Sequence, residues 1–328
     1  MTRIAVVGTD HFHVAELTAR LRDAGGEIVA VVPTEGSIGP WLASQHPGAR
    51  TDRPYDDDVD LVVTAAIPSE RAAIAIEAMR AGKDVVADKP GATSHDQLGA
   101  LRAACEQTGR RYTVVFSERL GAPAMTHAHA IAASGRIGTV VHTVGLGPHT
   151  LALDRRPQWF FDPARYGGIL VDIGSHQVDQ FLAFTGATDA AVVASTVRAH
   201  DDHPGVEVIG EMLLEAGHAT GYARVDYLTP AGLGAWGDVR FTVVGTDGFL
   251  EVRHVDQTVT VVDGERRETI ECAGGPVTWA DQVLAGSPPV TQEHVFTVTR
   301  ICLEAQERAR RLPRPGGLID GDSKGRLT

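Results

Sequence analysis

Short β-branched runs alternate with helix-period segments through the first third of the chain, and this alternation constrains the fold more than any other feature. A repeat of this kind predicts a parallel sheet with helices on both faces, and the continuous apolar content of the strands agrees with burial on both sides. Gly25, Gly82 and Gly109 each stand where a left-handed residue ends a helix. We expect strands at 3–7, 27–32, 60–66, 84–87 and 111–116, and helices at 14–24, 70–81 and 95–108.

The pattern changes after residue 116. Helical segments at about 124–134 and 173–185 precede alternating runs that are separated by turn dipeptides such as Asp247-Gly248 and Asp263-Gly264. We therefore expect a large, open, mostly antiparallel sheet, a last helix at about 291–311, and a tail at 313–328 that is loosely attached or bound by a partner. The expected strands lie at 191–198, 208–214, 221–227, 240–244, 248–253 and 257–262.

The length of the chain indicates two domains of the α/β class. At 328 residues it exceeds what one hydrophobic core usually organises. The change of pattern puts the boundary near residue 118, so we expect a Rossmann-type dinucleotide-binding domain over 1–118 and a substrate-binding α/β domain over 119–328.

Charge and cysteine content exclude several classes of partner. The formal net charge of −12 leaves no basic surplus for a nucleic acid or an anionic membrane, so small molecules are the expected partners. The three cysteines, Cys105, Cys272 and Cys302, are widely spaced and lack the close pairs of structural zinc sites. We expect a reducing cytoplasm, since the first apolar run is also too short for a signal peptide or a membrane span.

The loop from Gly8 to His13 lies where a dinucleotide fingerprint belongs, between the first strand and the first helix. The usual G-x-G-x-x-G spacing allows a tight turn and close approach of the backbone to pyrophosphate. Gly8 fills the first place, but Asp10 fills the second and His13 the third. We predict that cofactor is bound here by Gly8, Thr9, Asp10, His11, Phe12 and His13.

Asp10 would repel pyrophosphate unless its side chain turns away, and the simplest role for it is to cap the first helix. His11 and His13 could donate to phosphate. A metal site made of Asp10, His11 and His13 is the minor alternative, because loop residues this close rarely complete a coordination shell, and we expect no metal.

The end of the second strand normally carries an acid that binds the ribose 2′-hydroxyl. Here Pro33 or Thr34 fills that place, and Glu35 follows it. Glu35 would favour NAD, whereas Thr34 and Ser37 could bond a 2′-phosphate, although no nearby Arg or Lys supplies the charge typical of NADP sites. The cofactor is therefore NAD or NADP, with a slight preference for NAD, and Thr34 is a candidate contact.

Lys89 stands at the carboxyl end of the fourth expected strand, followed by a proline. Ligands bind outside that end of an open α/β sheet, so Lys89 is expected to point into the crevice and to donate to a substrate hydroxyl. A solvated lysine is the alternative, but the Asp88-Lys89-Pro90 context and the position argue against it.

Asp172 and His176 are four residues apart in an expected helix and so share one face, with Asp179 three residues further on. Removal of a hydride from a carbinol carbon needs a base for the hydroxyl proton, and histidine titrates near neutrality. The alternatives are Asp172 as a helix cap, His176 as a satisfied interior histidine, and a helix-borne metal site that lacks a third ligand.

These features together resemble the GFO/IDH/MocA oxidoreductase family, named for glucose-fructose oxidoreductase and inositol dehydrogenase. Asp88-Lys89-Pro90 resembles its Glu-Lys-Pro, Gly167-Gly168 through Asp172, His176 and Asp179 resembles its glycine, aspartate and histidine helix, and the segment 134–138 resembles its S-G-x-I-G turn. The departures are the damaged glycine loop, Asp88 for Glu, Arg71 where histidine is frequent, and the missing ribose acid.

The resemblance implies an enzyme that transfers a hydride between NAD or NADP and a secondary hydroxyl of a sugar, cyclitol or related metabolite. It implies Lys89, Asp172 and His176 as catalytic residues, further cofactor contacts at Ala66, Ile67, Pro68 and Lys89, and a homodimer or homotetramer. The loop 149–162, with Arg155, Arg156, Trp159 and Phe160, should border the substrate or form an interface or core loop. The rivals are a non-catalytic sensor or scaffold, and an enzyme with a tightly held, self-recycled cofactor.

Overall fold

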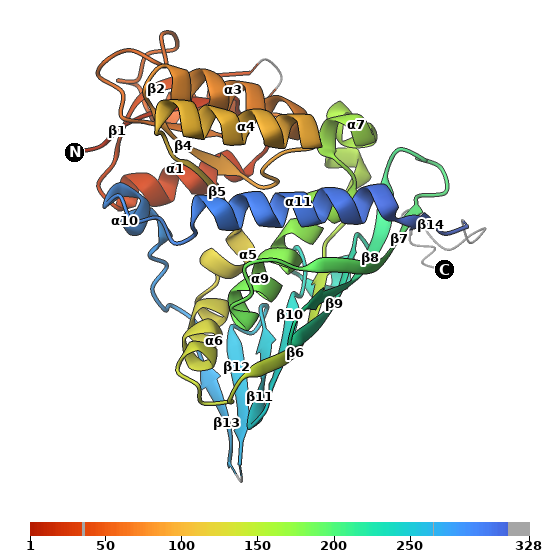
Figure 1. Ribbon diagram of the computed structural model, residues 1–328. Helices are drawn as coiled ribbons and strands as arrows, with labels where there is room; N and C mark the ends of the chain where they lie inside the picture. Colours follow the sequence, from red (N-terminus) through yellow and green to blue (C-terminus); the bar gives the residue numbers. More distant parts are fainter. Residues whose placement is uncertain (35–36, 265, 314–328) are drawn as a thin grey trace, which may run out of the picture.

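A computed structural model describes residues 1–34, 37–264 and 266–313 (Figure 1). Its first part is a five-stranded parallel sheet of order β2-β1-β3-β4-β5. This arrangement confirms the expected Rossmann-type sheet. The strands are β1 (Arg3–Val7), β2 (Glu27–Val32), β3 (Leu61–Thr64), β4 (Asp84–Asp88) and β5 (Tyr112–Val115).

The helices of the first part begin and end close to the expected residues. Gly25, Gly82 and Gly109 have φ of +94°, +79° and +67°, so each adopts the left-handed conformation that ends the helix before it. A short helix after β2 was missed, because its seven residues are too few to show a helical period. The helices are α1 (His13–Asp23), α2 (Gly39–Gln45), α3 (Pro68–Arg80) and α4 (His95–Thr108).

The strand order fixes where a ligand can lie. The chain moves from β1 to β2 on one side and then crosses to β3 on the other side of β1. The loops after β1 and β3 therefore diverge at this switch point and leave a crevice at the carboxyl ends of the strands. The β1–α1 loop and the end of β4 both lie at this edge of the sheet.

The second sheet has nine strands in the order β13-β12-β11-β10-β6-β9-β8-β7-β14. Its pairs are antiparallel except β6 with β9 and β14 with β7, which confirms a large, mostly antiparallel sheet. The strands are β6 (Val140–Pro148), β7 (Ala191–Ala199), β8 (Glu207–Ala216), β9 (Ala219–Asp226), β10 (Arg240–Gly245), β11 (Gly248–Arg253), β12 (Thr258–Asp263), β13 (Arg266–Glu271) and β14 (Arg310–Arg311).

Strand β6 was not expected, because glycines interrupt its apolar alternation. Gly145 and Gly147 leave room for Gln177, whose side-chain amide would lie 2.0 Å and 3.0 Å from a Cβ at these two positions. β13 was missed because its residues are mostly charged and exposed. Both strands therefore depend on their neighbours more than on their own composition.

The helices of the second part are mostly short. Helix α11 is the exception, and Figure 1 shows it running between the two sheets, where it packs on α4 and β5 on one side and on α8, α9 and β7 on the other. The helices are α5 (Ser117–Leu120), α6 (Pro123–Ala133), α7 (Pro163–Tyr166), α8 (Ile169–Asp172), α9 (Gly174–Thr185), α10 (Trp279–Leu284) and α11 (Gln292–Arg308).

Two further observations concern earlier expectations. Residues 314–328, which hold most of the expected tail, lie outside the described residues. Within the described part, no helix combines the length and the hydropathy needed to cross a membrane.

Asp179 joins three helices through a buried ion pair. Arg119 of α5 donates to both of its carboxylate oxygens at 2.7 Å and 2.6 Å, and His294 of α11 lies 2.7 Å from Oδ1. Burial alone would raise the pKa of Asp179, but Arg119 lowers it to about 2. Asp179 therefore serves the packing of α9 and does not extend the Asp172 and His176 stripe into the site.

Replacing Arg119 by Met should lower the free energy of unfolding by about 3–5 kcal/mol, because the Asp179 carboxylate is left buried and without its cation. Chemical denaturation at neutral pH measures this loss. The matched control is Arg300→Met, which removes a more exposed pair with Asp189 and Glu304 and should cost at most about 1 kcal/mol. Equal losses in the two variants would contradict the role given to Asp179.

Candidate functional site

Lys89 and Asp172 form a buried ion pair between the two parts of the molecule. Lys89 follows β4, Asp172 is the last residue of α8, and Nζ lies 2.6 Å from Oδ1. The Tyr227 hydroxyl, just after β9, donates to Oδ2 at 2.9 Å. Lys89 is only 3% exposed, so it is not a solvated lysine at a strand end.

The pKa of Asp172 follows from these contacts. Burial would raise the pKa, but the Lys89 charge and the hydrogen bonds from Lys89 and Tyr227 lower it below the usual range. The carboxylate is therefore charged at neutral pH and holds the ammonium group of Lys89 in place. Burial and the Asp172 charge raise the pKa of Tyr227 well above its usual value, so its hydroxyl stays a donor.

Asp172 and His176 do not share one continuous helix, contrary to expectation. Helix α8 ends at Asp172, and α9 begins at Gly174. Gly167 and Gly168 precede α8 with φ of +93° and +87°, and a Cβ at Gly168 would lie 2.3 Å from Gln306. The turn into α8 therefore requires glycine. Asp172 was considered above as a helix cap. Its carboxylate instead accepts hydrogen bonds from Lys89 and Tyr227.

His176 is a buried, uncharged histidine. It is 2% exposed, and its Nδ1 has no hydrogen-bond partner within the described residues. Burial lowers the pKa of His176, and the positive charge of Lys89 lowers it further. Its ring is therefore neutral at physiological pH, and the unpaired Nδ1 does not match a histidine satisfied by the core.

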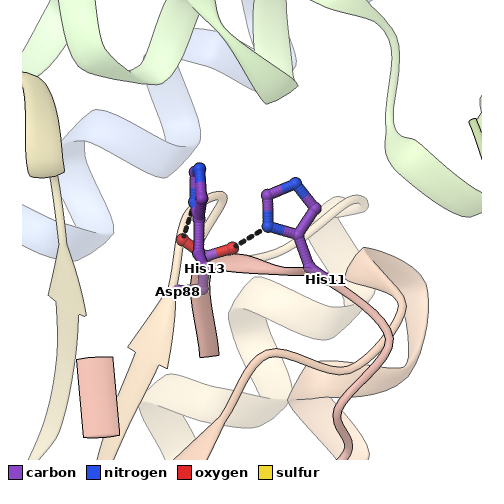
Figure 2. A group of neighbouring side chains, drawn as sticks. All are labelled: His11, His13 and Asp88. Atoms are coloured by element: carbon purple, nitrogen blue, oxygen red, sulfur yellow. Dashed lines mark hydrogen bonds and ion pairs between the residues drawn. The ribbon is translucent and has the colours of Figure 1, made fainter. Parts of the chain in front are cut away.

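Asp88 binds two histidines of the β1–α1 loop (Figure 2). His13 Nδ1 lies 3.0 Å from Oδ1, and His11 Nδ1 lies 3.1 Å from Oδ2. Arg71 of α3 is fully buried and donates to Oδ2 at 3.2 Å. Burial would raise the pKa of Asp88, but the histidines and Arg71 hold it well below the usual value.

Arg71 also fixes the backbone from which the lysine projects. Its guanidinium donates to the carbonyl oxygens of Ala66, Asp88 and Lys89. Arg71 thus joins the end of β3 to the end of β4 and sets the direction of the Lys89 side chain.

His11, His13 and Asp88 are also the types of residue that bind metal ions, and their ligand atoms lie within 4.8 Å of one another. Asp10, which the sequence suggested as a third ligand, is absent from this group. Asp88 already pairs with the guanidinium of Arg71, and a second cation there would be repelled by it. The group is therefore best explained as a carboxylate that orients two imidazole rings.

The β1–α1 loop keeps one of the features of a phosphate loop. Gly8 has φ of +78°, and a Cβ there would lie 2.4 Å from that of Ala66. In the described part of the chain, the N–H groups of Phe12 and His13 make no backbone hydrogen bond, and both point from the first turn of α1. Unpaired N–H groups at a helix N-terminus are a general binding site for phosphate.

Asp10 does not cap α1, contrary to expectation. The N-cap is Phe12, and no side chain bonds there. Asp10 Oδ2 instead accepts a hydrogen bond of 3.1 Å from the Thr34 hydroxyl, at the end of β2. Burial raises the pKa of Asp10, and the bond from Thr34 opposes this effect. Glu35, the other acid considered for the ribose, lies outside the described residues.

A cavity of about 360 Å³ connects this loop to the second part of the molecule. Asp10, His11 and Phe12 form one wall together with Ser37 and Ile38 of the β2–α2 segment. With the free N–H groups above, these residues fit the adenosine and pyrophosphate half of a dinucleotide. The opposite wall consists of Ala152, Arg155, Arg156, Pro157, Trp159 and Trp236.

The loop 149–162 was expected either to border the substrate or to form an interface or core loop. Its residues line the crevice, which agrees with the first of these. Arg156 donates to the carbonyl oxygens of Thr150 and Leu151 and its guanidinium lies 4.2 Å from the centre of the Phe160 ring, so its role is structural. Phe160 is buried in the core, and Arg155 lies 5.9 Å from the Trp236 ring. Arg155 is thus a cation of this wall that is not held by carbonyl groups.

The structure brings together some candidates and adds others. Lys89 and Asp172 are in contact and the charge of Lys89 acts on His176, while Thr9, Asp10 and Thr34 are joined by hydrogen bonds at the other end of the crevice. No sequence pattern indicated Tyr227 or Glu118, whereas His149 begins the loop 149–162 that was expected to border the substrate. Arg71 was noticed only as a departure from a family pattern.

Comparisons with known proteins agree with this geometry. Residues 2–116 match an oxidoreductase family with an NAD-binding Rossmann fold, and residues 125–251 match the GFO/IDH/MocA C-terminal domain. The 1,5-anhydro-D-fructose reductase of Ensifer adhaerens is 26% identical over 268 residues, which cover 78% of this chain and 77% of that protein.

Two solved structures illustrate the likeness. A protein of Erwinia carotovora atroseptica SCRI1043, described only by class as an oxidoreductase, is 34% identical with a TM-score of 0.91, over 95% of this chain and 100% of that chain. A levoglucosan dehydrogenase in complex with NADH and levoglucosan has a TM-score of 0.81 at 16% identity, over 93% of this chain and 97% of that one. The second likeness concerns the fold alone.

Replacing Tyr227 by Phe should lower the free energy of unfolding by about 1–3 kcal/mol, because a buried carboxylate loses a hydrogen bond that water cannot replace. Thermal or chemical unfolding measures the change. The matched control is Tyr222→Phe, whose hydroxyl bonds Glu211 at a partly exposed position and should matter less. A larger loss in the control would argue against the buried Asp172 pair as a stabilising contact.

Proposed function

The chain belongs to the GFO/IDH/MocA oxidoreductase family, and from this premise we propose that it transfers a hydride between NAD and a secondary hydroxyl of a sugar, cyclitol or related polyol. The observation that carries the proposal is the Lys89–Asp172 pair, 2.6 Å apart, with neutral His176 beside it. The relatives described as 1,5-anhydro-D-fructose reductase and levoglucosan dehydrogenase support a sugar-like substrate.

Each group has a separate task in this proposal. The bound nicotinamide supplies or accepts the hydride. Lys89 uses one N–H on Asp172, which leaves two to donate to the substrate oxygen and to stabilise the alkoxide as it develops. His176 takes the hydroxyl proton on a ring nitrogen. Asp172, itself bonded by Tyr227, holds Lys89 in position.

Burial strengthens these interactions. Lys89 and His176 are each less than 4% exposed, so the developing negative charge meets the ammonium group with little screening by water. This arrangement favours catalysis over the rival of a non-catalytic sensor, which has no need of a buried lysine beside a neutral histidine.

We infer a preference for NAD from Asp10. Its carboxylate bonds Thr34 at the end of β2, where a Rossmann fold places the acid that binds the ribose. Asp10 therefore supplies from the neighbouring loop the acid that the β2 end lacks. A 2′-phosphate would be repelled by it.

Two weaker inferences accompany this function. Val193 and Leu213, on neighbouring strands β7 and β8, are exposed apolar side chains, and a second copy of the chain would cover them in a homodimer or homotetramer. The three free, buried cysteines are consistent with the reducing cytoplasm expected above.

Replacing His176 by Asn should lower kcat by roughly 10²–10⁴-fold while the Kd of NAD changes little, because only proton transfer is removed. Steady-state kinetics with glucose, myo-inositol, levoglucosan and 1,5-anhydro-D-fructose, together with calorimetry of NAD, measures both. His129→Asn is the control, since His129 bonds only the Ala183 carbonyl and lies on α6.

Full activity of the His176 variant would remove this residue from the mechanism. Lys89 is best tested as the double variant Lys89→Met, Asp172→Asn, because a single change leaves one charge buried alone. If neither dinucleotide binds the wild-type protein and none is retained on purification, the proposed function fails.

Replacing Asp10 by Ser should weaken NAD binding roughly tenfold and improve the binding of NADP relative to NAD, because the ribose loses an acceptor and a 2′-phosphate loses a repulsive charge. Calorimetric titration with both dinucleotides gives the ratio. Asp23→Ser, at the exposed end of α1, controls for net charge. An unchanged ratio in the Asp10 variant would show that another group selects the cofactor.

A further inference from the structure

Glu118 and His149 face each other beside Lys89, and the reaction described above uses neither. Glu118 lies on α5, directly after β5, and is 5% exposed, while His149 follows β6. Glu118 Oε1 and His149 Nε2 are 3.9 Å apart, which is too far for a hydrogen bond. Gln177, the residue after His176, donates to Glu118, and the ring of His149 lies 6.4 Å from that of Tyr227, which bonds Asp172, so both groups lie near the reaction centre.

The contacts of Glu118 determine which of its oxygens can carry a proton. Oε2 accepts two hydrogen bonds, from the amide groups of Gln177 at 2.8 Å and Gln180 at 3.0 Å. Oε1 is fully buried and has no hydrogen-bond partner among the described residues. A proton on this carboxyl group therefore belongs on Oε1, the oxygen nearest to His149.

The contacts of His149 determine its tautomer in the same way. Nδ1 lies 3.2 Å from the carbonyl oxygen of Gly147 and must carry the hydrogen of that bond. Burial, and next the charge of Lys89, lower the pKa of His149 to about 3, so the ring is neutral. Its Nε2 is then an acceptor.

In the described part of the chain, the two cations that could hold Glu118 as a carboxylate are already paired. Arg119, its neighbour on α5, is bound by Asp179 of α9, and Lys89 is bound by Asp172. Burial raises the pKa of Glu118 to about 8, with Asp179 adding to this effect and Lys89, Gln177 and Gln180 opposing it. Glu118 is therefore an uncharged donor at neutral pH.

We propose that Glu118 and His149 form a second hydroxyl-binding site beside Lys89, where the carboxylic acid donates to one substrate hydroxyl and the imidazole accepts from it. A hydroxyl group accepts and donates at once, so it complements this pair. One oxygen atom can bond both groups across the 3.9 Å gap. The proposal rests on the proposed function and narrows the substrate to polyols with a second hydroxyl near the reacting one.

The protonation of Glu118 can be tested without any activity. A folded-state pKa of about 8 means that the folded protein holds one proton more than the unfolded chain between about pH 5 and 8, so stability is lost as pH rises through this window. Relative to Glu118→Gln, the unfolding equilibrium constant of the wild type should rise by up to roughly tenfold per pH unit and level off above about pH 8. Chemical denaturation from pH 5 to 9 measures it.

Glu207→Gln is the matched control, because Glu207 is equally buried but is paired with Arg311. It should not reproduce the relative gain of stability at high pH. A wild type and a Glu118→Gln variant whose stabilities run parallel from pH 5 to 9 would overturn the proposal, whether or not the enzyme is active.

Substrate recognition is tested with the most active compound among glucose, myo-inositol, levoglucosan and 1,5-anhydro-D-fructose, and with its monodeoxy analogues. In the wild type, loss of one hydroxyl next to the reacting carbon should lower kcat/KM by 100-fold or more, on the order expected for a buried polar site left unpaired. Glu118→Leu should reduce this discrimination to roughly threefold, and Glu118→Gln should flatten the decline of kcat/KM above about pH 8.

Equal discrimination in Glu118→Leu and the wild type would overturn the hydroxyl site even if Glu118 is protonated. If no compound is turned over by the wild type, the proposed function fails, and the unfolding measurements still decide the state of Glu118.

Discussion

The arrangement of the site depends on one buried ion pair, Lys89 with Asp172, because it joins the end of a strand in the first part of the molecule to a helix of the second part. A lysine ammonium or a carboxylate alone in a dry interior costs several kcal/mol, so each requires the other, and the end of β4 must meet the end of α8. Arg71 also supports this arrangement. By binding the carbonyl oxygens of Ala66, Asp88 and Lys89, it fixes the backbone that directs the lysine.

Contacts of a buried carboxylate also order the unusual β1–α1 loop. Asp10 and His13 stand where glycines are usual, and the Asp88 carboxylate lies 3.0 Å from His13 Nδ1 and 3.1 Å from His11 Nδ1. The loop therefore gains order from side chains, whereas a glycine-rich loop gains close approach from their absence. Only Gly8 must remain, because a Cβ there would lie 2.4 Å from Ala66.

Much of the fold follows from local sequence, and the site follows only in part. Strand runs such as 3–7 and 27–32 are long, apolar and bounded by turns, so their pattern indicates them directly. Lys89 was found because the end of a parallel strand is a defined place, whereas Tyr227 and Glu118 reach the site through pairings of distant strands and helices. The break between α8 and α9 at Ile173 was missed because it is slight. The backbone there stays near helical values, with φ of −92° and ψ of −37°.

The charged side chains around the reaction centre form ion pairs with one another. Lys89 is bound by Asp172, Arg71 by Asp88, and Arg119 by Asp179, and these carboxylates have lowered pKa values. Burial keeps His176, His149 and Glu118 neutral there, because it raises the pKa of the carboxyl group and lowers the pKa of the two imidazoles. An uncharged polyol can enter such a centre and leave these charges paired, whereas none of the three cations in these pairs is free to bind an anion. The balance of buried charge thus selects neutral, hydroxylated substrates before any individual contact is made.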